Sequence, residues 1–201
     1  MQQATALHTQ LHRSETILSK AKTWIAAPQH KTISHWFVEQ LDIRPYQHIL
    51  EIGYGPGNGL YEVAKKLQIG FLAGIDGSLN HFLQAARKNK KFIDDDLLHL
   101  HLGCLEQLPY PHHYFHSIYL GNMYYSWDQP QDRFMQLHSL LKSGGKMITI
   151  VQPPAAPREK DLWNEAEKIQ EQYTEAGFFD VRIAFREMHA GDAISVAGYK
   201  E

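Results

Sequence analysis

The sequence predicts an α/β fold with a doubly wound, mostly parallel sheet of seven strands and a C-terminal antiparallel hairpin. Three observations predict it. Short apolar runs alternate with segments of helical periodicity, the first apolar run leads directly into a glycine-rich loop, and the last two runs are separated only by a short turn region around Gly191 and Asp192. Strands that alternate with helices form a parallel sheet covered on both faces.

Each element follows from the spacing of apolar residues and from the breakers between them. Pro28 separates two N-terminal helices, Gly144 and Gly145 stop the helix before the fifth strand, and Gly177 ends the last helix. The expected helices are 13–26, 31–41, 60–67, 79–90, 130–141 and 159–176, and the expected strands are 48–52, 71–75, 98–102, 117–120, 146–151, 181–185 and 193–199.

The chain length suits a single domain over residues 1–201. We expect a helical extension over 1–44, a core over 45–151, and a closing helix and hairpin over 152–201. Lys and Arg number 20 against 22 Asp and Glu, so no global basic field favours nucleic acid or an anionic membrane. The basic run Arg87, Lys88, Lys90 and Lys91 is more typical of a solvated helix end.

Cys104 is the only cysteine, which excludes an intrachain disulfide and a cysteine-rich zinc site. No stretch has the apolar length of a membrane span, and the N-terminus lacks the apolar core of a signal peptide. We therefore expect a cytoplasmic protein without membrane or nucleic-acid partners, and the sequence leaves its oligomeric state open. Two sets of histidines could suggest a metal site: the pair His8 and His12, and the group His112, His113 and His116. Neither set has an acidic third ligand in a suitable pattern, so no metal is expected.

The glycine loop lies between the first expected strand and the following helix, in the run Leu50 to Gly59. Glycines at the carboxyl edge of a parallel sheet let the chain turn sharply and approach a ligand closely. The dinucleotide fingerprint fails, because Asn58 stands where its third glycine should be, and no Gly-Lys-Ser/Thr follows to complete a P-loop. A nucleoside-type cofactor fits this place better than a dinucleotide.

Asp76 lies 19 residues after Gly57, at the end of the second expected strand. An acidic side chain there can accept hydrogen bonds from both hydroxyls of a ribose. The alternative is a helix N-cap or turn residue, since Gly77 and Ser78 follow. The glycine loop upstream favours the ribose interpretation.

Four segments together resemble a known family. They are Leu50-Glu51-Ile52-Gly53-Tyr54-Gly55-Pro56-Gly57, then Ile75-Asp76-Gly77-Ser78, then Gly103-Cys104-Leu105-Glu106-Gln107-Leu108-Pro109-Tyr110, and finally Leu140-Leu141-Lys142-Ser143-Gly144-Gly145-Lys146. Over residues 45 to 151 the chain resembles the class I S-adenosylmethionine-dependent methyltransferases, which have a Rossmann-like fold. The resemblance implies S-adenosylmethionine as the cofactor and methyl transfer as the reaction.

The resemblance also implies roles for single residues. Glu51 would orient the loop, Gly53 and Gly55 would lie against the methionine part, and Asp76 would hold the ribose. Cys104 departs from the family pattern, in which an aspartate accepts from the adenine amino group, so that contact would pass to the backbone of Leu105. The full set of expected cofactor residues is Glu51, Gly53, Tyr54, Gly55, Gly57, Asp76, Gly77, Ser78, Cys104, Leu105, Gly121 and Asn122.

The acceptor should lie near the loop that follows the fourth strand, where Tyr124, Tyr125 and Trp127 could form a pocket wall or simply pack the next helix. In relatives, an N-terminal extension often covers the cofactor as a lid. Trp24, His30, His35 and Trp36 are accordingly candidate pocket residues, with ordinary packing as the alternative. Methyl transfer needs mainly alignment and exclusion of water, so a base is optional. His113, Tyr124 and Tyr125 are the weak catalytic candidates.

A small-molecule acceptor is expected, since the chain is short and carries no basic face. Two alternatives remain. One is a non-catalytic S-adenosylmethionine-binding regulatory or scaffolding subunit, which the substituted Cys104 keeps open. The other is a nicotinamide-dependent oxidoreductase, which the glycine spacing disfavours.

Overall fold

The computed structural model describes residues 27–153, 159–188 and 191–201. The expected helix 13–26 and Trp24 lie outside these residues. The helices are α2 (Ala27–Gln40), α3 (Asn58–Ala64), α4 (Leu79–Lys88), α5 (Lys90–Asp94), α6 (Pro130–Leu140) and α7 (Glu159–Glu175), with 3-10 turns η1 (Leu105–Gln107) and η2 (Asn122–Ser126). The strands are β1 (His48–Ile52), β2 (Phe71–Asp76), β3 (Leu98–Leu102), β4 (Phe115–Leu120), β5 (Leu141–Val151), β6 (Phe179–Arg186) and β7 (Ala193–Tyr199).

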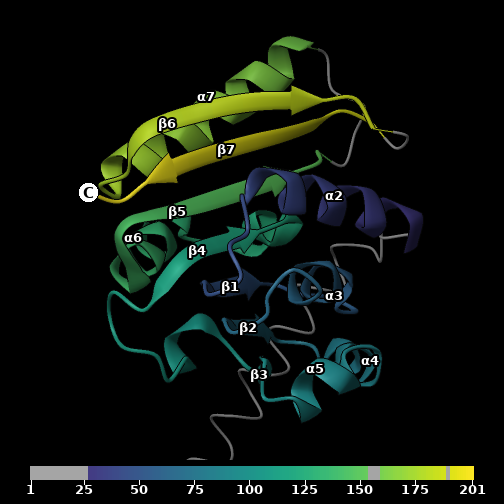
Figure 1. Cartoon of the computed structure of the whole chain (residues 1–201). Helices are drawn as coiled ribbons and strands as arrows, with labels where there is room; N and C mark the ends of the chain where they lie inside the picture. Colours follow the sequence, from purple (N-terminus) through teal and green to yellow (C-terminus); the bar gives the residue numbers. More distant parts are fainter. Residues whose placement is uncertain (1–26, 154–158, 189–190) are drawn as a thin grey trace, which may run out of the picture.

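The seven strands form one sheet in the order β3-β2-β1-β4-β5-β7-β6, which Figure 1 shows from bottom to top. Strands β1 to β5 pair in parallel, and β7 pairs antiparallel with both β5 and β6. The predicted fold class, including the C-terminal antiparallel hairpin, is confirmed. The strand order reverses between β1 and β4, and ligands of open α/β sheets bind at the carboxyl ends of the strands beside such a switch point.

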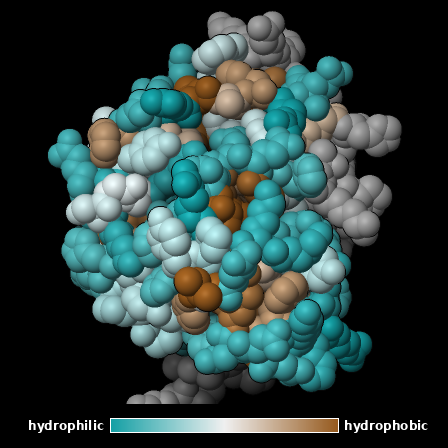
Figure 2. Space-filling model, viewed as in Figure 1, coloured by the Kyte–Doolittle hydropathy of each residue, from teal (hydrophilic) through white to brown (hydrophobic). Residues whose placement is uncertain are grey.

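Helices cover both faces of the sheet, because successive side chains of each strand point to opposite sides. On β1, Ile49 packs into a core with α2, α3 and α4, whereas Leu50 packs into a second core with α6 and α7. Both side chains are fully buried. On the face that Figure 2 shows, hydrophilic residues predominate and the apolar residues form small separate patches.

The expected helix 79–90 is wrong as a single element, because Asn89 ends α4 and α5 begins after it. The side chain of Asn89 is fully buried. Its Nδ2 donates to the carbonyl of Gly57 at 3.1 Å and to that of Ala85 at 3.0 Å. Helix α4 therefore ends at Asn89, whose side chain connects this end of the helix to the glycine loop.

The expected stop at Gly144 and Gly145 is also wrong. Helix α6 ends at Leu140, and β5 begins at Leu141. Leu141 pairs with Phe115, but the next pair joins Lys146 to Ser117, so the extra residues of β5 form a bulge. Gly144 has a φ of 73°, and its N–H donates to the carbonyl of Lys200 at 2.7 Å. The glycines therefore shape the bulge instead of ending the helix.

Pro28 lies inside α2 as described, so α2 begins earlier than the expected helix 31–41; the helix expected before Pro28 lies outside the described residues. The remaining elements agree with expectation apart from their ends. The observed bounds differ for α3 (58–64 against 60–67), β2 (71–76 against 71–75), β4 (115–120 against 117–120), α6 (130–140 against 130–141), α7 (159–175 against 159–176) and β6 (179–186 against 181–185). Boundaries shift by such amounts because apolar periodicity does not mark caps.

Histidines gather at the amino edge of the sheet, at the starts of β1 and β4. The backbone N–H of His48 donates to Nδ1 of His116 at 2.9 Å. The His48 ring lies 4.7 Å from the Tyr114 ring between centroids. Burial, and then the nearby Lys142, lowers the pKa of both His48 and His116. Both imidazoles are therefore held neutral in the folded protein.

We expect acid to destabilise the fold through this cluster. As pH falls through 6.5, the ordinary histidine value, the unfolded chain takes up protons before the folded one does, so the free energy of unfolding decreases until the lowered folded pKa is reached. Urea unfolding between about pH 7.5 and pH 5 measures this loss. His48→Phe should make it smaller, whereas His35→Gln, at an exposed position, should not; an equal loss in all three proteins would contradict the assignment.

Candidate functional site

The site is built where β1 and β2 end, beside the switch point. The loop after β1 makes three left-handed turns, with φ of 73° at Gly53, 53° at Gly55 and 80° at Gly57. Residues with a side chain rarely adopt such angles, so the loop depends on glycine. The N–H of Gly53 donates to the carbonyl of Ile75 at 2.7 Å, which fixes the start of the loop against β2.

The glycines of the site serve two different purposes. A Cβ at Gly57 would lie 2.8 Å from Cβ of Ala85, and one at Gly59 would lie 2.5 Å from Oε1 of Glu51, so these two positions are needed for packing. A Cβ at Gly77 or Gly121 would meet no atom closer than 3.8 Å. At Gly77 and Gly121, on the two sides of the glycine loop, a Cβ would therefore make only ordinary van der Waals contacts.

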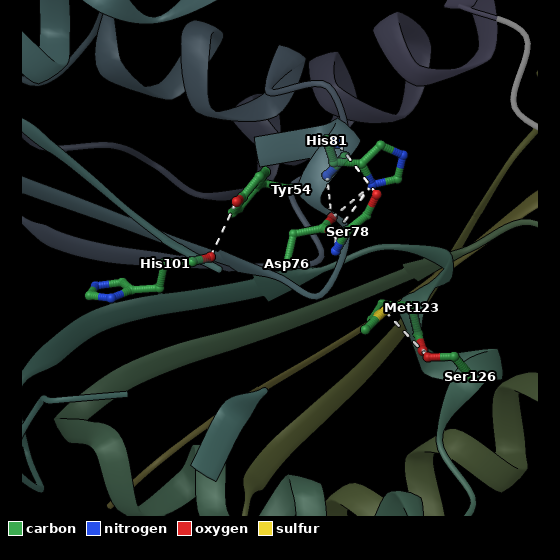
Figure 3. A network of polar contacts seen from close by, with 8 residues as sticks. Tyr54, Asp76, Ser78, His81, His101, Met123 and Ser126 are labelled. Carbon is green, nitrogen blue, oxygen red and sulfur yellow. Dashed lines mark hydrogen bonds and ion pairs between the residues drawn. The ribbon is translucent and has the colours of Figure 1, made fainter. Parts of the chain in front are cut away.

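Asp76 joins the glycine loop to helix α4 (Figure 3). Its Oδ2 accepts from the N–H of Gly55 at 2.8 Å, and its Oδ1 accepts from the N–H of Ser78 at 2.9 Å. The side chain is buried, with 8 % of the residue exposed. The N-cap of α4 is Ser78, whose Oγ accepts from the N–H of His81 at 3.3 Å. The side chain of Asp76 thus stabilises the turn before α4, but the N-cap of that helix is Ser78 and not Asp76.

His81 was not identified from the sequence. Its Nδ1 lies 3.2 Å from both carboxylate oxygens of Asp76, and this contact raises the pKa of His81. The available signal was a histidine in the first turn of the helix that directly follows Asp76. Such a spacing allows the imidazole to reach the end of the strand. Whether it contacts Asp76 depends on the geometry of the turn between them.

Glu51 lies on β1, and its carboxyl group is close to Gly59 at the start of α3. Its Oε2 accepts from the hydroxyl of Tyr119 at 2.7 Å. Burial raises the pKa of Glu51 to about 8, and the hydrogen bond from Tyr119 only partly opposes this. The carboxyl also interacts with the backbone of Leu60 on α3. Glu51 therefore connects β1, β4 and α3 around the glycine loop.

Tyr54 packs inward from the glycine loop. Its hydroxyl donates to the carbonyl of His101 on β3 at 3.2 Å, and its ring occupies the space where a Cβ at Gly74 would lie. Burial raises the pKa of Tyr54. The side chain therefore supports β2 and β3, and a ligand in the loop would meet the backbone of Tyr54.

The loop after β4 closes the opposite side of the site. Asn122 Oδ1 accepts from the N–H of Gln152 at 2.7 Å, which ties this loop to the end of β5. A Cβ at Gly53 would lie 3.0 Å from Cβ of Met123, so Met123 lies directly against the glycine loop. Ser126 Oγ donates to the carbonyl of Met123 at 2.7 Å. Met123 had not been singled out from the sequence, where only its place after Asn122 pointed to it.

The aromatic residues of this loop divide between packing and exposure. Tyr124 is buried, donates to Gln172 Oε1 at 3.0 Å, and stacks on Phe134 at 6.0 Å between ring centroids. Trp127 meets Phe134 edge-on at 5.6 Å. The packing alternative therefore holds for Tyr124 and Trp127. Tyr125 is the most exposed of the three, at 42 %, whereas Trp127 is half-buried.

Two further candidates are corrected by their positions. Trp36 is buried beneath Arg186, whose guanidinium carbon lies 4.8 Å from the ring centroid, so it packs α2 onto the sheet. His113 precedes β4, and its N–H donates to the carbonyl of Ser139 at 3.0 Å. It thus lies at the amino edge of the sheet, opposite Asp76, which removes it as a general base. The side chain of His30 is not among those that the structure describes. His35 is exposed beside Glu39.

Cys104 opens the 3-10 turn after β3. Its N–H donates to Oε1 of Gln107 at 3.2 Å, and its thiol is exposed. Burial, together with Glu106, raises the pKa of Cys104. The side chain of Leu105 packs into the core, so a ligand at this edge would meet backbone and a neutral thiol.

Within the described residues, no three His, Cys, Asp or Glu side chains come together as a metal site. His8 and His12 lie outside that range. Nor does any described helix have the length and apolar character needed to cross a membrane.

We expect Glu51→Gln to remove a pH-dependent loss of stability. The folded protein holds the Glu51 proton up to about pH 8, while the unfolded chain loses it near 4.5, so the wild-type free energy of unfolding falls between these values. The variant should gain about 2 kcal/mol or more over wild type at pH 8 relative to pH 5. Urea unfolding of both proteins measures the difference, and parallel pH profiles would contradict a buried neutral carboxyl.

Comparisons with known proteins agree with this architecture. A family profile described as a methyltransferase domain matches residues 49–145. The uncharacterized methyltransferase YdaC of Bacillus subtilis is 30% identical over 168 residues, which cover 81% of this chain and 88% of that protein. A tRNA U34 carboxymethyltransferase from Colwellia psychrerythraea is 28% identical over 151 residues, covering 69% of this chain and 46% of that enzyme.

A solved structure described as a SAM-dependent methyltransferase from Aquifex aeolicus superposes with a TM-score of 0.67. The match covers 90% of this chain and 96% of that one at 15% identity, which shows a shared fold. The similarity to YdaC extends over most of both chains. The chain therefore belongs to the class I S-adenosylmethionine-dependent methyltransferase family.

Proposed function

We propose that this protein is an S-adenosylmethionine-dependent methyltransferase that acts on a small-molecule acceptor by direct methyl transfer. One observation carries the proposal. The buried carboxylate of Asp76 lies at the end of β2, bonded to the left-handed glycine loop at the point where the strand order reverses. A ribose diol needs such an acceptor, and a nucleoside needs the close backbone approach that the glycines allow.

The residues present fit this cofactor. Gly53 and Gly55 would offer backbone to the amino-acid part, Asp76 would accept from the ribose, and the adenine would lie beside the backbone of Gly77, where a Cβ would meet no atom closer than 3.8 Å. The backbone of Leu105 and the thiol of Cys104 border that side. When bound, S-adenosylmethionine supplies an electrophilic methyl group on a sulfonium sulfur.

The chain's part in the reaction is alignment and exclusion of water. Gly121 and Met123, in the loop after β4, flank the glycine loop on the side away from Gly77. Tyr125 is the most exposed aromatic residue of the loop after β4. These residues would hold an acceptor beside the glycine loop, where the bound cofactor would supply its methyl group. The net charge of -2 gives no general attraction to a polyanion, which favours a small acceptor, and the exposed thiol of Cys104 suits a reducing cytoplasm.

Calorimetric titration with S-adenosylmethionine, S-adenosylhomocysteine and NAD tests the cofactor. We expect both sulfur compounds to bind in preference to NAD, and Asp76→Ala to weaken S-adenosylhomocysteine binding about tenfold or more, because two hydrogen bonds to a carboxylate are lost. Asp94→Ala, which removes an exposed carboxylate paired with Lys90, is the matched control and should bind like wild type.

A second experiment addresses the acceptor. Small phenols, thiols and amines, with tRNA as the macromolecular comparison, are incubated with the protein and S-adenosylmethionine and examined for a mass gain of one methylene unit. Methylation of a small molecule supports the proposal. Methylation of tRNA alone contradicts the acceptor class, binding without any turnover favours a regulatory subunit, and a preference for NAD overturns the cofactor.

A further inference from the structure

The imidazole of His81 occupies the acceptor face of Asp76. His81 lies in the first turn of α4, and Nδ1 is 3.2 Å from Oδ1 and 3.2 Å from Oδ2. Figure 3 shows the ring beside the carboxylate, next to Ser78. One nitrogen therefore bridges the two oxygens that a ribose diol would use.

The remaining capacity of the carboxylate is largely taken. The N–H groups of Gly55 and Ser78 each hold one oxygen. A carboxylate has about four lone-pair sites, so these two donors and a bridging imidazole leave too few for two ribose hydroxyls. Only 10% of the Asp76 side chain is accessible, and His81 borders it. The backbone donors belong to turns that the fold requires, whereas the imidazole can move.

We propose that His81 and the cofactor ribose compete for Asp76, so that cofactor binding displaces His81 and releases its proton. This inference rests on the proposed function. The His81 side chain is 41% exposed, so it can rotate into solvent without leaving a buried polar group behind. His81 thereby makes cofactor affinity depend on pH.

The direction of the dependence follows from the contact. Asp76 raises the pKa of His81 above 6.5, so displacement returns the ring to its ordinary value and a proton leaves in the range between. Cofactor affinity is then lowest in acid and rises with pH until His81 is neutral in the free protein. This is the opposite of a histidine that binds an anionic ligand.

The neighbouring titratable groups do not reverse this sign. Glu51 on β1 and Tyr54 in the glycine loop interact with Asp76, and burial raises the pKa of both. Tyr54 therefore stays neutral, and Glu51 stays mostly neutral below its pKa of about 8. Beyond β3, Cys104 interacts with Glu106 and Arg133. The basic residues of α4 itself lie in its last turn, away from His81.

Calorimetry with S-adenosylhomocysteine as the probe tests the inference on wild type, His81→Ala and His81→Gln at about pH 6 and about pH 7.5, both below the pKa of Glu51. We expect His81→Ala to bind about three- to tenfold more tightly than wild type at the lower pH, and by a smaller factor at the higher. His81→Gln removes the titration, so its affinity should not change between the two. His99→Ala is the matched control, because His99 forms a similar contact with Asp96 at 2.8 Å on the amino side of β3.

Proton release in the unmodified protein provides a readout that needs no variant. Titrations near neutral pH in buffers of different ionisation enthalpy should show a proton released by wild type and by His99→Ala but not by His81→Ala. Weaker binding by His81→Ala at both pH values would overturn the proposal and make His81 a cofactor contact. If S-adenosylhomocysteine binds and the His81 substitutions change neither its affinity nor the proton release, this inference alone is overturned. If none of the proteins binds S-adenosylhomocysteine, the proposed function is overturned as well.

Discussion

The carboxylate of Asp76 is the interaction on which the site depends. It accepts from Gly55 in one turn and from Ser78 in the next, so a single buried group sets the glycine loop after β1 relative to the helix after β2. Parallel strands place these two turns at the same edge, and the hydrogen bond from Gly53 to Ile75 fixes where the glycine loop begins, but the loop beyond Gly53 needs a further constraint to hold it against the turn before α4. The shared anion supplies that constraint, because an unpaired buried carboxylate would be costly.

Other buried polar groups hold the loop from behind. Asn89 reaches from the end of α4 to the carbonyl of Gly57, and Glu51 receives the hydroxyl of Tyr119 while standing where a side chain at Gly59 would be. Each contact links the loop to a different element. The loop therefore keeps its left-handed turns as part of the fold, and its backbone is preorganised for a nucleoside.

The acceptor side is built with less polar contact. Tyr124 and Trp127 serve the core beneath α6, which leaves Met123 and Tyr125 near the place where methyl transfer would occur. Such a surface can shape an apolar acceptor but provides no fixed base. Methyl transfer from a sulfonium does not require one, so alignment between the loops after β1 and β4 is a sufficient role for this chain.

The sequence by itself determined the sheet, its strands and the position of Asp76, because apolar periodicity and a glycine loop after a buried strand are local signals. Tertiary structure decided what those signals do not contain. Asn89 splits a continuous helical pattern because it reaches Gly57, which is distant in sequence, and Tyr124 turns inward because Phe134 and Gln172 meet it there. His113 shared the expected chemistry of a base but lies at the wrong edge of the sheet, while His81 lies on Asp76 through a turn whose dihedral angles no spacing rule specifies.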